Sequence, residues 1–182
     1  MPRYIVLLRG VNVGGKNKIV MPQLKSALER VGFDNVVTYI NSGNILLDSE
    51  WSDAAVRKIC EAVIADEFAL QIPSNVIEEN VLHSALVQAP DWWNQDDDSK
   101  HNAIFVIAPA NPEEILEHIG AIKPELERVE CCGQVIFWSA PTATYGRSRL
   151  TKIVQDKSAY NAITIRNANT TLKLAALAKE KK

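Results

Sequence analysis

Residues 36–47, VVTYINSGNILL, decide the fold that the sequence predicts. Two apolar runs rich in β-branched residues, 36–40 and 45–47, flank the turn at 41–44. Asparagine and glycine tolerate the positive φ angles of a tight turn, so this pattern is typical of a β-hairpin. Upstream, the dense apolar run at 4–8 predicts a buried strand.

A helix is expected on each side of this hairpin. Before it, Pro22 suits the first position of a helix, apolar residues recur at helical spacing over 24–31, and Gly32 is a typical stop. After it, Ser52 is a candidate N-cap for a helix whose apolar stripe runs over 56–63.

The first half ends with a short strand within 70–77, which Pro73 places at the edge of a sheet. The resulting order, βαββαβ, is the ferredoxin-like arrangement. A linking helix is expected at 79–87, followed by the polar loop 89–100 with its acidic run at 96–98. We place the boundary between two domains in this loop.

The same order of elements is then expected again. Strands are predicted at 102–107, 127–132, 134–139 and 162–165, with helices after the capping box of Asn111, Pro112 and Glu114 and at 150–156. The sequence therefore predicts an α+β fold of two ferredoxin-like βαββαβ units with antiparallel sheets, plus a linking helix and a C-terminal helix. The expected boundaries are 1–78 for the first unit, 79–100 for the linker and 101–182 for the second unit.

We also predict the N-cap and the buried residues of the C-terminal helix. Asn169 is expected to be its N-cap, because an asparagine side chain accepts a hydrogen bond from a backbone N–H two or three residues later. Leu172, Leu174 and Ala175 would then dock the helix on the protein body.

Composition bounds the possible functions. The 182 residues are 47% hydrophobic and 23% charged, as in ordinary globular proteins, and the net charge of -2 argues against a tight nonspecific grip on nucleic acid. The three cysteines, Cys60, Cys131 and Cys132, lack the spacing of a zinc site or a disulfide framework and favour a reducing cytoplasm. The apolar run at 5–8 is too short for a signal peptide, and no stretch is long enough to span a membrane.

Three stretches carry a family resemblance: LLRGVNVGGKNK at 7–18, TYINSGN at 38–44 and RNANTTLKL at 166–174. Together they resemble an uncharacterised bacterial family, domain-of-unknown-function family 1697. That family usually has glutamine at the position of Asn41 and tryptophan at the position of Ala168. The resemblance implies a ferredoxin-like α+β fold and implies no activity.

One glycine-rich loop invites comparison with a phosphate loop. Residues 10–16 fit the pattern G-x-x-x-x-G-K after a strand. In a nucleotide-binding phosphate loop a Ser or Thr follows the lysine and a helix begins at once, whereas Asn17 follows here and the helix is expected only at Pro22. A general anion-binding loop remains one interpretation, and a tight glycine loop with a solvated lysine is the other.

Topology brings this loop next to the hairpin turn. In a ferredoxin-like unit the first strand ends at the edge where the second and third strands are joined. We therefore expect one corner with two cations and several amide side chains, suited to a phosphate, a carboxylate or a sugar. Its candidate ligand-binding residues are Arg9, Asn12, Lys16, Asn41, Ser42 and Asn44. The alternative is that the two loops simply brace each other.

The same geometry predicts a second basic cluster in the other half. Arginine binds phosphate through two parallel hydrogen bonds, and several arginines follow strands that should end at one edge. The candidates are Arg147, Arg149, Arg166, Asn167 and Lys173. The alternatives are a solvated basic face and, for Arg166, an ion pair that locks the C-terminal segment in place.

Three functions remain open from sequence. The first is a cytosolic protein that binds a phosphorylated small molecule or nucleotide, as a binding protein or as an enzyme of unknown reaction. The second is a nucleic-acid-binding module that uses the basic cluster, and the third is a protein-interaction domain that uses Trp92 and Trp93. The three histidines lack metal-ligand spacing, so no metal site is expected. No cofactor, catalytic residue or oligomeric state is identified.

Overall fold

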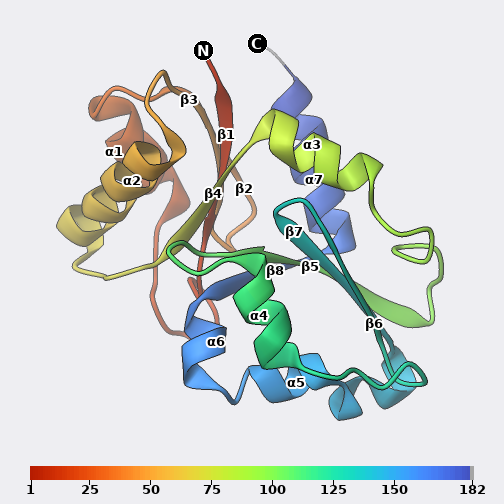
Figure 1. The fold of residues 1–182 in the computed structure, drawn as a ribbon. Coiled ribbons are helices and arrows are strands. Elements are labelled where there is room, and N and C mark those ends of the chain that lie inside the picture. The colour runs from red at the N-terminus through yellow and green to blue at the C-terminus, as the bar shows by residue number, and fades with distance from the viewer. Residues whose placement is uncertain (181–182) are drawn as a thin grey trace. The chain divides into compact units, whose positions relative to one another are not determined.

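The computed structural model describes residues 1–180 (Figure 1). The chain forms two compact units: the first comprises Met1–Asn80 together with the chain from Lys173 onward, and the second comprises Val81–Leu172. The C-terminal helix is therefore shared between the units, whereas the sequence analysis assigned it wholly to the second. The division falls at Asn80, within the segment expected to be a linker.

The first unit has the predicted βαββαβ order. Its elements are β1 (Arg3–Leu8), α1 (Met21–Arg30), β2 (Asp34–Tyr39), β3 (Asn44–Asp48), α2 (Asp53–Phe68) and β4 (Ser74–Glu78). The four strands form an antiparallel sheet in the order β2-β3-β1-β4, so β4 is an edge strand as Pro73 indicated. Helices α1 and α2 lie together on one face of this sheet (Figure 1).

Alternation along β1 explains that packing. Side chains two residues apart point to the same face of a strand, and Tyr4, Val6 and Leu8 all belong to the core beneath the two helices. Leu24 and Leu28, one turn apart on α1, are fully buried against them. Burying such a side chain stabilises the fold by about 1.5–3 kcal/mol.

The second unit repeats the order with additions. Its elements are α3 (Glu79–Val87), β5 (Ser99–Val106), α4 (Pro112–Ile119), β6 (Arg128–Cys132), β7 (Val135–Pro141), a 3₁₀ helix η1 (Thr142–Arg147), α5 (Arg149–Ile153), α6 (Lys157–Asn161), β8 (Ile163–Asn167) and α7 (Ala168–Lys179), which continues into the first unit. The sheet order is β6-β7-β5-β8, again antiparallel. The predicted α+β fold with two four-stranded antiparallel sheets is confirmed.

In this unit one predicted helix start is confirmed, and one predicted helix is divided in two. The capping box of Asn111 and Glu114 opens α4 as predicted. The single helix expected at 150–156 is instead two short helices. Asp156 ends the first and caps the second, because its Oδ1 accepts hydrogen bonds from the amides of Ser158 and Ala159 at 3.0 and 3.3 Å.

The prediction for the C-terminal helix is wrong in register. The side chain of Asn167, rather than Asn169, caps α7 by accepting from the Thr170 amide at 2.8 Å. The buried residues Thr171, Leu174 and Ala178 recur at spacings of three and four, so they share one face of α7. Accordingly Leu174 is buried and Leu172 is 41% exposed. Within residues 1–180, no helix has both the length and the apolar character required to cross a membrane.

Candidate functional site

The end of β1 and the β2–β3 turn meet as predicted. We call residues 9–20 and 40–44 the loop corner. The Leu8 amide donates to the Gly43 carbonyl at 2.8 Å, and the Asn12 side chain donates through Nδ2 to the Asn41 carbonyl at 2.7 Å. Leu7 pairs with Asn44 across β1 and β3, which fixes the turn at this end of the sheet.

Gly43 permits that close approach. Its φ of +79° lies in the left-handed region, which favours glycine. A Cβ at this position would lie 2.5 Å from Cγ2 of Val11 and 2.7 Å from Cβ of Leu8. The turn and the β1 loop are thus packed in direct contact.

Two of the predicted ligand-binding residues, Asn12 and Asn44, instead bind groups of the protein itself. Asn12, at a φ of +54°, also donates through Nδ2 to the Ile19 carbonyl at 3.0 Å and accepts from the Ile19 amide at 2.9 Å. Asn44 is fully buried and donates to the Tyr39 carbonyl at 3.1 Å and to Oγ of Ser42 at 2.9 Å. The loops do brace each other through these two side chains.

Two lysines of the corner face outward, whereas Arg9 and Ser42 are half-buried. Lys16 and Lys18 are exposed, and neither forms an ion pair with any of residues 1–180. Lys16 closes a tight hairpin, donating from its amide to the Val13 carbonyl at 3.0 Å. The hairpin tip, Gly14 and Gly15, has positive φ angles and open space around both residues. Lys18 was not among the predicted residues.

Charge and backbone strain both set the corner apart. Residues 9–20 contain three cations and no Asp or Glu, and residues 40–44 contain no charged residue. Ile40, a β-branched residue, has a φ of +47° and is 51% exposed. Such strain is rare for isoleucine and is concentrated at functional sites. The corner is therefore a rigid, positively charged surface.

The corner is not a nucleotide-binding phosphate loop. Helix α1 begins at Met21, and four residues, 17–20, separate it from Lys16. Val20, at the N-cap, makes no side-chain capping bond. The positive end of the helix dipole therefore does not follow the lysine directly, as the sequence had indicated.

The second predicted cluster is not assembled. Arg166 is buried, donates from Nη1 to Oγ1 of Thr164 at 2.8 Å and to the Ile165 carbonyl at 2.9 Å, and burial lowers its pKa to about 10. Arg149 binds the Ala121 carbonyl through Nε at 3.1 Å.

Sheet order explains the separation. The Arg149 amide donates to Glu127, which directly precedes the edge strand β6, whereas Arg166 lies on the opposite edge strand, β8. With β7 and β5 between them, these edge strands are about 14 Å apart. Arg147 is exposed in η1, Asn167 caps α7, and Lys173 is exposed on the part of α7 that belongs to the first unit.

The tryptophan pair packs within the second unit. Trp93 is buried, donates from Nε1 to the Asn102 carbonyl at 2.9 Å and meets the ring of Phe137 edge-on at 4.8 Å. Trp92 is half-buried. Trp93 therefore does not present its ring to a partner protein.

Histidines and cysteines also lie in structural settings. His101 is buried between Oγ of Ser139, at 2.6 Å from Nδ1, and the Asp96 carbonyl, at 2.9 Å from Nε2. Burial raises the pKa of the Cys60 thiol to about 12. Within residues 1–180 no three His, Cys, Asp or Glu side chains are grouped to hold a metal ion.

One polar cluster was missed by the sequence analysis. Arg3, at the start of β1, donates from Nη1 to Oδ1 of Asp48 at 2.8 Å and to the Asn35 carbonyl at 3.4 Å. Asn35 in turn donates from Nδ2 to Oδ2 of Asp48 at 2.8 Å. Nε of Arg3 is buried and has no hydrogen-bond partner among the described residues, a cost of about 1–3 kcal/mol. The opposite charges of Arg3 and Asp48, which face each other across β1 and β3, were the signal for this pair.

The two ferredoxin-like units and the basic loop corner define a class of α+β protein without a recognisable catalytic centre among the described residues. The chain belongs to the family described as "Protein of unknown function (DUF1697)", whose model matches residues 1–137.

Solved structures support the fold. The conserved bacterial protein SP0830 from Streptococcus pneumoniae is 29% identical, with a TM-score of 0.87 over 98% of this chain and 99% of that chain. An unknown protein from Galdieria sulphuraria is 12% identical with a TM-score of 0.25, over 91% of this chain and 96% of that chain, which is too low for any inference. No curated protein matches the chain.

Proposed function

We propose that the loop corner binds the phosphate group of a phosphorylated small molecule or nucleotide. The observation that carries the proposal is the charge of this surface, which has three cations and no Asp or Glu over residues 9–20. A local excess of positive charge attracts anions and raises their concentration near the surface.

In this proposal the residues of the corner have different roles. Lys16 supplies the charge at the hairpin tip, and Arg9 adds a second cation from the end of β1. The amides of Gly14 and Gly15 donate no hydrogen bond to any described residue, so they can donate to phosphate oxygens. Ser42 and the side chain of Asn41 offer further polar contacts.

Asn12 and Asn44 serve this site indirectly. Both side chains are engaged in bonds that hold the two loops together. Because the two loops are already held in place, Lys16 and the turn amides would lose little conformational entropy when a ligand binds.

The nucleic-acid alternative has weaker support. It required Arg149 and Arg166 to act on one phosphate backbone, but they belong to opposite edges of the sheet and Arg166 is shielded from solvent. The phosphate-binding proposal therefore concerns the loop corner alone.

Calorimetric titration with pyrophosphate and with ATP, at constant ionic strength, tests the proposal. Lys16→Ala should weaken binding about tenfold or more, since a hydrogen bond to a charged group contributes about 1.5–3 kcal/mol. Lys123→Ala removes the same charge from an exposed site in the second unit and should bind as the wild type does. Equal affinities for the wild type and Lys16→Ala would refute the proposal.

A further inference from the structure

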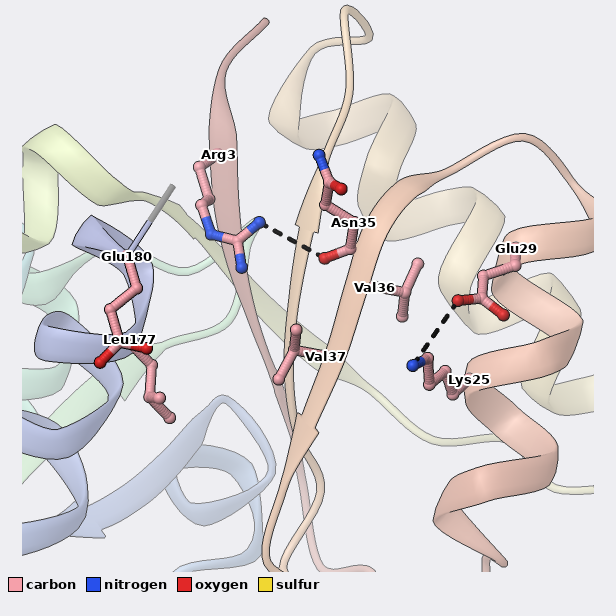
Figure 2. A pocket seen from close by; sticks show the side chains of 8 residues that line it. All are labelled: Arg3, Lys25, Glu29, Asn35, Val36, Val37, Leu177 and Glu180. Atoms are coloured by element: carbon pink, nitrogen blue, oxygen red, sulfur yellow. Dashed lines mark hydrogen bonds and ion pairs between the residues drawn. The ribbon is translucent and has the colours of Figure 1, made fainter. Parts of the chain in front are cut away.

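A hollow of about 420 Å³ lies in the first unit, beside the first residues of β1 and β2 (Figure 2). It is lined by Arg3, Lys25, Glu29, Asn35, Val36, Val37, Leu177 and Glu180. Arg3 is the first residue of β1, whereas the loop corner follows Leu8, the last residue of that strand. Its volume is within the range of small-molecule sites, about 300–1,000 Å³.

Arg3 is held through one of its two terminal nitrogens. Both of its hydrogen bonds use Nη1, with Asp48 and Asn35 as the acceptors. In Figure 2 the other terminal nitrogen, Nη2, points away from the Asn35 carbonyl. Neither Nη2 nor the buried Nε makes a hydrogen bond to any residue that the structure describes. Because Nε is buried, Nη2 is the nitrogen through which Arg3 can donate a charge-assisted hydrogen bond to a ligand carboxylate.

The other charged groups of the hollow divide into a pair and a single carboxylate. Lys25 and Glu29 are 3.8 Å apart on α1 and form an ion pair, drawn as a dashed line in Figure 2. Glu180 is exposed and forms no ion pair with a described residue. The hollow therefore offers Arg3 to an anionic group and Glu180 to a cationic group.

Apolar side chains complete the walls. Val36 is buried, and Val37 and Leu177 are half-buried. Val36 belongs to the core beneath α1 and α2, so Val37, its neighbour on β2, points to the opposite face of the sheet.

We propose that this hollow binds a small zwitterion of the amino-acid class with an apolar side chain. The ligand carboxylate accepts from Nη2 of Arg3, its ammonium group lies on Glu180, and its side chain lies against Val37 and Leu177. This site is independent of the loop corner, because the two have no residue in common.

Titration with L-leucine and its two truncated analogues tests the assignment. 4-Methylpentanoate lacks the ammonium group and 3-methylbutylamine lacks the carboxylate, so both should bind at least about tenfold more weakly than leucine. Leucine that binds no more tightly than either analogue, or that gives no saturable signal at tens of millimolar, overturns the proposal.

Two variants locate the binding. Glu180→Gln should weaken leucine binding about tenfold and leave 4-methylpentanoate binding unchanged, whereas Glu117→Gln, an exposed carboxylate in the second unit, should change neither. Unchanged or tighter leucine binding by Glu180→Gln refutes the role of Glu180. Lys16→Ala should leave leucine binding intact, so failure of the phosphate site and failure of this site are distinguishable.

Discussion

Replacing Asn12 with glycine removes the bonds that hold the loop corner while keeping its backbone conformation. The side chain makes three hydrogen bonds of 2.7–3.0 Å, two with Ile19 and one with the Asn41 carbonyl. Each contributes about 0.5–1.5 kcal/mol net, so Asn12→Gly should lower the free energy of unfolding by about 3 kcal/mol. Alanine loses the same bonds and also strains the left-handed backbone, at a further cost of about 1–2 kcal/mol.

Urea unfolding followed by circular dichroism measures these differences, provided that the slope with urea stays unchanged. Asn17→Gly is the matched control, because Asn17 has a φ of +49° in the same loop but makes only one side-chain hydrogen bond, to the Gly10 carbonyl at 3.0 Å. It should cost about 1 kcal/mol. If Asn12→Gly is no more destabilising than Asn17→Gly, the side chain of Asn12 does not brace the corner.

Further predictions concern Gly43, the N-cap of α7 and Cys60. Gly43→Ala should cost about 3 kcal/mol in urea unfolding, because its Cβ would overlap Val11 at a positive φ; a cost near zero would mean that the turn has room to move. Asn167→Ala should cost about 1 kcal/mol and Asn169→Ala almost nothing, and the reverse ranking would restore Asn169 as the cap of α7. Cys60 should resist thiol reagents near neutral pH until the protein unfolds. Because its pKa is raised from 9.0 to about 12, its contribution to stability should decline as pH rises from 9 towards 12, and ready labelling of the folded protein would contradict its burial.

Local signals in the sequence were sufficient for most of the fold. The hairpin at 36–47 and the apolar spacing of α1 each determine structure within a few residues, because the turn and the buried stripe are set by neighbours in sequence. The capping box at Asn111 likewise determines where α4 begins. Topology then placed the β1 loop beside the β2–β3 turn without any knowledge of side-chain contacts.

Choices that depend on tertiary packing were harder to predict. Asn167 and Asn169 are equally good caps in isolation, and the end of β8, where Asn167 pairs with Asn102, decides between them. The amide groups of Asn12 and Asn44 can bind a ligand or a backbone carbonyl, and only the packed loops show that they bind carbonyls. The hydrogen bonds of Arg3 likewise depend on how β1, β2 and β3 meet in the first unit.

Amide chemical shifts during a titration with pyrophosphate test the phosphate site most directly. We expect saturable shifts at Gly14, Gly15 and Lys16, with smaller ones at Ser42, and we expect Lys16→Ala to abolish them. The contrary result is a set of amides at the hairpin tip that stay unmoved at saturating pyrophosphate, or that move equally in Lys16→Ala, and either would show that the loop corner does not bind phosphate.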